Sequence, residues 1–120
     1  MPDAASRFPR QKRLRSKPEF DRVFERSIRS SDAFFSVLAR MNELGFPRLG
    51  LAVSVKAAGS GVARNRLKRV IRESFRLVSG LPSLDLVVTA RPGAAREPRT
   101  VLRASLDGHW QRLAERCARS

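Results

Sequence analysis

Leu84-Asp-Leu-Val-Val-Thr-Ala90 is a nearly continuous apolar run, and it decides what kind of sheet this chain can form. A strand that is apolar on both faces is typical of the inside of a sheet, so residues 84–90 predict a central strand. Ahead of it, Ser79-Gly80-Leu81-Pro82 carries the glycine and proline that end helices. The residues from Val62 to about Leu77 predict the strongest helix of the chain. Its inward face comprises Leu67, Val70, Ile71, Ser74 and Val78.

Two further strands are predicted on the N-terminal side of this helix. Residues Phe34–Met41 form one of them, and Asn42–Pro47 has the composition of a turn. The second is Arg48–Lys56, in which alternate residues share one face: Leu49, Leu51, Val53 and Val55. The short turn between the two predicts an antiparallel hairpin. A flexible loop, Ala58–Gly61, then leads into the helix.

A helix is predicted near each end of the chain. Ser16-Lys17-Pro18-Glu19 matches the S-x-x-E capping box. Apolar residues then recur at helical spacing, at Phe20, Val23 and Phe24, so the first helix runs to about Ser27. The last helix is predicted from Thr100 to about Ala118, after a loop at Arg91–Arg99. Its candidate core residues are Leu102, Leu106, Trp110, Leu113 and Cys117.

The element order is therefore α-β-β-(β)-α-β-α, with one short strand left unassigned. This order predicts an α/β fold of the α+β sandwich kind, in which helices pack on one mixed sheet of about four strands. The whole sheet belongs to a single small domain, residues 16–120. Residues 1–15 are basic and have little apolar pattern, so they predict a flexible N-terminal arm.

Charge narrows the classes of function. The chain has 120 residues with 25 Lys+Arg against 11 Asp+Glu, a formal net charge of +14. Such an excess favours a polyanion, most often a nucleic acid, because each neutralised phosphate releases counter-ions. An anionic membrane surface is the alternative and predicts a long amphipathic helix. A single cysteine, the absence of a secretory leader and the lack of a run of about 18 apolar residues together predict a cytoplasmic protein.

Residues 64–76 are the most informative part of the chain. Six of these thirteen residues are basic and only Glu73 is acidic, whereas ordinary solvated helix faces mix the two signs. On a helix, residues four apart form a stripe, which here comprises Arg64, Lys68, Arg72 and Arg76. Asn65 suits either a helix cap or a hydrogen bond to RNA. The pattern predicts that this helix contacts nucleic acid.

A self-contained nuclease is not predicted. It requires a cluster of carboxylates for metal ions or a pair of histidines for acid–base catalysis. The acids are scattered, and His109 and Cys117 are the only residues of their kinds. We therefore predict no catalytic residue and no metal ligand in the protein. A ribosomal or other structural RNA-binding protein of the same fold class stays open as an alternative to the function considered next.

Arg64–Arg76 resembles the RNR signature of the bacterial ribonuclease P protein subunit. The resemblance extends from Phe8 onward. It includes Arg13-Leu-Arg15 with Phe20–Phe24, then Leu44–Val53, Leu86–Arg91 and the helix that contains Trp110. It implies the family's left-handed β-α-β crossover, whereas general rules of topology predict the right hand.

The resemblance also implies a function. In that family the RNA subunit removes the 5′ leader of precursor tRNA, using magnesium or similar divalent ions held mainly by the RNA. One protein per ribonuclease P RNA is implied, with precursor tRNA as substrate and no membrane or stable protein partner. The residues implied to contact the catalytic RNA are Arg64, Asn65, Arg66, Lys68, Arg69, Arg72 and Arg76. Those implied to border the leader cleft are Phe20, Phe24, Lys56 and Arg91.

The sequence departs from the family pattern at two places. Val55 stands where relatives usually have the first lysine of a pair, and Leu38 lies where many have an aromatic residue. Both departures concern the leader cleft. Phe20 and Phe24 each suit either the core or the cleft, so the sequence leaves their placement open.

Overall fold

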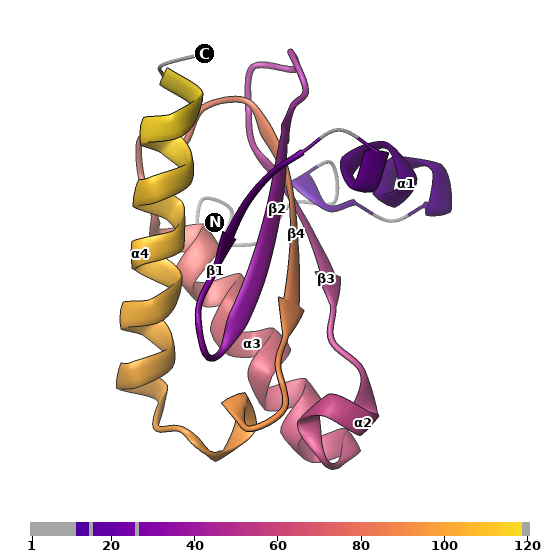
Figure 1. Ribbon diagram of the computed structural model, residues 1–120, viewed down its shortest axis with the longest axis vertical. Helices are drawn as coiled ribbons and strands as arrows, with labels where there is room; N and C mark the ends of the chain where they lie inside the picture. Colours follow the sequence, from indigo (N-terminus) through magenta and orange to yellow (C-terminus); the bar gives the residue numbers. More distant parts are fainter. Residues whose placement is uncertain (1–11, 15, 26, 119–120) are drawn as a thin grey trace, which may run out of the picture.

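A four-stranded mixed sheet forms the centre of the molecule in the computed structural model (Figure 1), which describes residues 12–14, 16–25 and 27–118. The strand order is β1-β2-β4-β3. The strands are β1 (Ile28–Ser31), β2 (Phe35–Met41), β3 (Arg48–Ala52) and β4 (Leu84–Ala90). The helices are α1 (Lys17–Glu25), α2 (Val55–Ala58), α3 (Gly61–Leu77) and α4 (Arg99–Ala118), with a 3-10 turn, η2 (Ala94–Arg96).

The central position of β4 is confirmed. It pairs antiparallel with β2 and parallel with β3, and its residues from Leu84 to Val88 are all buried. The predicted hairpin is wrong, because β4 lies between β2 and β3. An interior position pairs both backbone edges of β4 and places its two apolar faces under the helices on either side of the sheet. Residues 42–47 are long enough to cross the resulting gap of about 10 Å, two strand spacings.

Two differences between the predicted and the observed strands involve serine residues: the unassigned strand, β1, and the early end of β3. β1 pairs with β2 from Ile28 to Ser31, and its polar Ser30 and Ser31 concealed it in the sequence. β3 ends at Ala52, earlier than predicted, because the side chain of Ser54 accepts a hydrogen bond from the amide of Ala57. This cap starts α2, so Val55 and Lys56 are helical.

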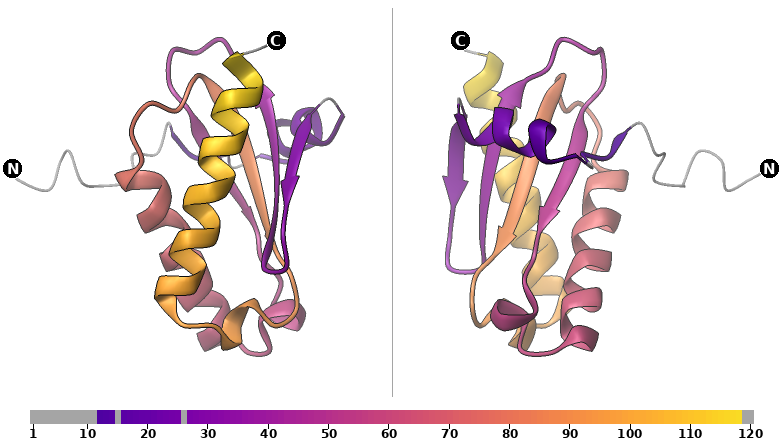
Figure 2. Two further views of the ribbon diagram at one scale, coloured as in Figure 1. Left: turned by 60° about the vertical axis from the view of Figure 1, so that its left-hand side comes forward. Right: turned by 90° about the vertical axis from the view of Figure 1, so that its right-hand side faces the viewer.

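The two faces of the sheet carry different helices (Figure 2). α3 and α4 cover one face, where the main core includes Leu67, Ile71, Leu106 and Trp110. α1 crosses the other face, over a small cluster formed by Leu14, Val23 and Val87. Because β3 and β4 are parallel and α3 returns on the face opposite α1, the β3-α3-β4 crossover is left-handed (Figure 2). The hand implied by the resemblance is therefore confirmed.

A buried polar network joins β1 to α4. His109 is fully buried, and its Nδ1 lies 2.7 Å from Ser30 Oγ and 3.1 Å from a guanidinium nitrogen of Arg112. Because Arg112 can only donate, Nδ1 accepts, and the neutral ring carries its proton on Nε2. Nε2 lies 3.2 Å from Asp32 Oδ2, in contact but poorly aligned for a hydrogen bond. The ring thus has a structural role.

This network predicts a loss of stability in mild acid. Burial lowers the pKa of His109, and the opposing attraction of Asp32 is smaller. Below about pH 6.5 the unfolded chain therefore binds a proton more readily than the folded chain, and the free energy of unfolding falls as pH falls. Thermal melts at pH 7.5 and pH 5 will show this loss in the wild type. His109→Gln will show a weaker pH dependence over the same range; an unchanged dependence would exclude His109 as its source.

Asp32 contributes at much lower pH. Burial raises its pKa, but hydrogen bonds from Ser105 and from the backbone amides of Phe35 and Phe34 outweigh burial and lower the pKa to about 2. Its stabilising effect is complete above pH 3.8 and is lost as pH falls toward 2. The pH range of the His109 experiment therefore excludes the titration of Asp32.

Candidate nucleic-acid interface

The basic side chains of α3 point in three directions rather than along one stripe. Because residues on a helix are 100° apart, Lys68 and Arg72 lie on the side toward β3, and Asn65, Arg69 and Arg76 point outward. The last three are exposed, as a surface contact requires. Arg64 lies nearest the core on the β3 side, and its Nε donates to the carbonyl of Val53 at 2.6 Å. Arg66 lies on the opposite side, facing η2.

Lys68 and Arg72 border a pocket of about 310 Å³ between α3, β3 and the segment before α1. Arg13 brings a third cation to its rim, and the apolar lining consists of Leu14, Phe20, Leu49 and Leu51. Leu14 is held there because its amide donates to the carbonyl of Leu49 at 2.9 Å. Arg13 and Leu14 of the predicted arm are thus paired with Leu49 at the edge of the sheet. Residues 1–11 and 15 lie outside the described residues.

The pocket concentrates positive charge. Burial lowers the pKa of Lys68, and the charges of Arg64 and Arg72 lower it further. Burial also lowers the pKa of Arg72, with additional repulsion from Arg13 and Arg64. Cations that repel one another around an apolar floor form a site to which a phosphate and an unstacked base can bind together.

The structure separates the two phenylalanines that the sequence left open. Phe20 is half-buried and packs on Gly50: a Cβ added at Gly50 would lie 2.7 Å from Phe20 Cζ. A side chain at position 50 would displace the ring, so Phe20 both packs on the sheet and borders the cationic pocket. Phe24 is 52% exposed, one helical turn further along α1.

A second part of the α1 face has no helix over it (Figure 2, right). One row across the strands consists there of small residues: Ser31 pairs with Ser36, Ser36 with Thr89, and Thr89 with Ala52. Two exposed cations lie near this row. Lys56 is in α2, shortly after β3 ends, and Arg91 comes directly after the end of β4. They therefore lie at the opposite end of the sheet face from the start of α1, not beside Phe20.

A largely buried ion network, which was not predicted from the sequence, fixes α1 to the sheet. Arg48 donates from Nε and one Nη to the two carboxylate oxygens of Asp85, at 2.8 and 2.7 Å. Its other Nη contacts Glu19 Oε2 at 2.7 Å. Glu19 Oε1 accepts from the amide of Ser16, which confirms the predicted capping box. The sequence does contain a signal for this network. Opposite charges stand in two predicted strands, Arg48 directly before Leu49 and Asp85 inside an apolar run, where an unpaired charge would be costly.

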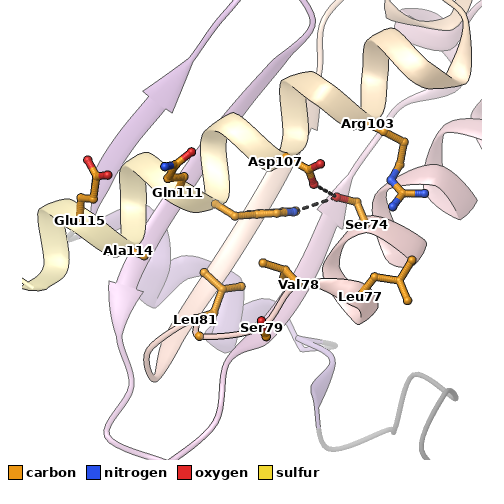
Figure 3. A pocket seen from close by; sticks show the side chains of 12 residues that line it. Ser74, Leu77, Val78, Ser79, Leu81, Arg103, Asp107, Gln111, Ala114 and Glu115 are labelled. Carbon is orange, nitrogen blue, oxygen red and sulfur yellow. Dashed lines mark hydrogen bonds between the residues drawn. The ribbon is translucent and has the colours of Figure 1, made fainter.

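A separate apolar cavity of about 400 Å³ lies between the C-terminal part of α3 and α4 (Figure 3). At its inner end the Trp110 indole donates to Ser74 Oγ at 2.9 Å, and Ser74 in turn donates to Asp107 at 3.3 Å. Asp107 and Glu115 line its α4 side (Figure 3). Carboxylates there disfavour a phosphate, although Arg103 also lines the cavity.

Two kinds of feature are absent from the part of the chain that the structure describes. No group of three or more His, Cys, Asp or Glu side chains there is arranged to hold a metal ion. None of its helices combines the length and the apolar character that crossing a membrane requires.

The comparisons with known proteins agree with this geometry. A family model described as "Ribonuclease P" matches residues 8–114. The chain is 50% identical to the ribonuclease P protein component of Methylococcus capsulatus, over 94% of this chain and 89% of that protein. It is 41% identical to that of Legionella pneumophila strain Corby, over 89% of this chain and 93% of that protein.

Solved structures show the same fold. The Staphylococcus aureus RNase P protein superposes with a TM-score of 0.78 at 30% identity, covering 83% of this chain and 93% of that one. The Thermotoga maritima RNase P protein gives a TM-score of 0.75 at 32% identity, covering 83% and 96%. The fold, the basic helix and the extent of these matches lead to one conclusion: the chain belongs to the ribonuclease P protein family.

Proposed function

We propose that this chain is the protein cofactor of a ribozyme, in which the RNA subunit cleaves precursor tRNA and the protein supplies binding surfaces. The observation that carries the proposal is the pocket that places Phe20 and apolar side chains beside Arg13, Lys68 and Arg72. A pocket of cations and apolar side chains binds single-stranded RNA without a catalytic group of its own. The family match disfavours the alternative of a ribosomal protein.

The two RNA partners use different surfaces in this proposal. The outward side of α3, with Asn65, Arg69 and Arg76, contacts the ribonuclease P RNA, one protein to each RNA. The pocket and the open row of the sheet receive the 5′ leader, with Phe24 close enough along α1 to stack on a base. Magnesium or similar ions are held mainly by the RNA, and the protein favours their binding by bringing the two RNAs together.

Reconstitution tests the proposal. Purified protein is mixed with ribonuclease P RNA at limiting magnesium and given precursor tRNA. The expected result is cleavage at the 5′ junction by the mixture, and by neither component within the same time. An RNA that stays inactive with the protein contradicts the cofactor role. Cleavage by the protein alone contradicts catalysis by the RNA.

Phe24→Ala tests the leader surface. Because Phe24 is 52% exposed, its truncation removes little packing and the melting temperature will change little. Loss of one stacked base costs about 1–3 kcal/mol, so the affinity of the holoenzyme for leader-bearing precursor will fall about fivefold or more. Affinity for mature tRNA will be unchanged.

Phe20→Ala is the informative comparison for that experiment. Its ring also packs on Gly50, so this variant will lower both the melting temperature and the affinity for precursor. Equal losses for precursor and mature tRNA in Phe24→Ala would exclude a contact between Phe24 and the leader.

A further inference from the structure

Arg66 binds the protein itself. One Nη donates to the carbonyl of Ala95 at 3.0 Å and the other to the carbonyl of Glu97 at 2.8 Å. Both terminal nitrogens of the guanidinium are therefore directed at the η2 turn, and the side chain is half-buried. The residue between the two bound carbonyls is Arg96.

The clamped turn is held from within as well. Gly93 has a backbone φ of 98°, which residues other than glycine rarely adopt, and Ala94 beside it is fully buried. The amide of Arg96 donates to the carbonyl of Gly93 at 3.1 Å, and that of Glu97 to the carbonyl of Ala94 at 3.0 Å. Backbone hydrogen bonds and the Arg66 guanidinium together hold the backbone on both sides of residue 96 in place.

The side chain of Arg96 is free to bind a ligand. It is exposed and has no hydrogen bond or ion pair with any of the described residues. η2 packs against α3 beside the N-terminal part of that helix (Figure 1), where Asn65 and Arg69 are exposed on neighbouring positions. A cation carried by a fixed backbone next to this surface extends the surface from the helix onto the loop before α4.

We propose that Arg96 binds a phosphate of the ribonuclease P RNA, and that Arg66 is the positioning residue that holds it there. The inference rests on the proposed function, since it adds a contact to the RNA surface of α3. It reverses the expectation for Arg66, whose charge contributes to binding through the turn rather than through an RNA contact of its own. Ordering the turn before binding lowers the entropy cost of the Arg96 contact.

A double-mutant cycle tests both parts of the proposal. The affinity of the full chain for ribonuclease P RNA, without tRNA, is measured over a salt series for wild type, Arg96→Ala, Arg66→Ala and the double variant. Arg96→Ala will weaken binding about fivefold near physiological salt and reduce the salt slope by about 0.7 to 0.9, the value for one phosphate contact. Arg66→Ala will cause a similar loss, and the double variant no more than either single change.

Controls separate the possible causes. Arg29→Ala removes the same charge from β1, which lies at the opposite edge of the sheet from β3. It will leave the affinity for ribonuclease P RNA nearly unchanged. If Arg66→Ala does not fold, Arg66→Gln, which keeps a donor for one carbonyl, takes its place in the cycle.

Three results overturn the inference while wild-type binding stays intact. They are full affinity in Arg96→Ala, losses that add in the double variant, and a lower melting temperature without loss of affinity in Arg66→Ala. Failure of the proposed function is distinct from all three, because the wild-type protein itself would not bind the RNA.

Discussion

Arg48→Met will lower the free energy of unfolding by about 3 kcal/mol, because it leaves a buried carboxylate without its cation. Asp85, whose side chain is 9% exposed, would then keep a side-chain hydrogen bond from just one of the described residues, Asn42, at 2.9 Å. The hydrogen bond from Arg48 to Asp85 raises the pKa of Arg48, with further contributions from both carboxylates. Removing the arginine leaves a buried carboxylate without its cation, which costs more than the lost contact itself.

Thermal melts measure this effect as a fall in melting temperature on the order of 10 °C. The control is the double variant Arg48→Met with Asp85→Asn, which replaces both charges by neutral side chains and will recover part of the loss. A double variant less stable than Arg48→Met alone would contradict the assignment of the loss to an unpaired carboxylate.

Arg48→Met also has a local consequence for binding. Arg48 holds Glu19 in the first turn of α1, and Phe20 is the next residue. Loss of the ion pair frees this end of α1 to move relative to the sheet. Below its melting temperature the variant will therefore bind leader-bearing precursor more weakly than the wild type does, with less effect on mature tRNA.

Arg72→Glu will weaken the binding of leader-bearing precursor to the holoenzyme by about 100-fold, the largest functional effect that we expect from one substitution. The change removes one cation from the pocket and places an anion where a phosphate would lie. Filter binding or fluorescence anisotropy with leader-bearing precursor and the holoenzyme measures the loss. The fall will be steeper at low salt, because exposed charges are screened as salt rises.

Arg72→Glu will not lower the stability of the fold. Arg72 is repelled by Arg13 and Arg64 in the free protein, so a carboxylate at position 72 relieves repulsion. Melting temperature will stay the same or rise while affinity falls, which separates binding from folding. Lys17→Glu is the matched control, a charge reversal of a side chain that is 86% exposed on α1. Equal losses of affinity in the two variants would mean that net charge, not the pocket, governs binding.

The elements with strong patterns could be predicted from the sequence. β4 was predicted at Leu84–Ala90 and in the centre of its sheet, because its run is apolar on both faces. α3 was predicted to within a residue at its start, since Leu67, Val70 and Ile71 repeat with helical spacing. Both signals are local and strong, and the packing of the fold agrees with them.

The pairing of the strands could not be predicted in the same way. A short turn favours a hairpin, but β2 and β3 are separated by β4, which begins at Leu84, 43 residues after β2 ends at Met41. Periodicity was equally limited for the candidate site. It predicted that Arg66 lies away from the apolar face, yet the carbonyls that it binds belong to a loop about thirty residues away.

The positions of the acids couple affinity to stability in this chain. Asp85 and Glu19 hold Arg48, Glu73 binds Arg99 and Arg103 between α3 and α4, and Asp32 faces His109. Neutralising any of these carboxylates would increase the net positive charge, and thus the general attraction to RNA. It would also remove a contact between two elements of the fold and lower the free energy of unfolding. Removing any of these four acids therefore gains attraction to RNA only at a cost in stability. New cations at places such as the pocket rim add attraction without breaking an internal pair, although they add to the repulsion already present there.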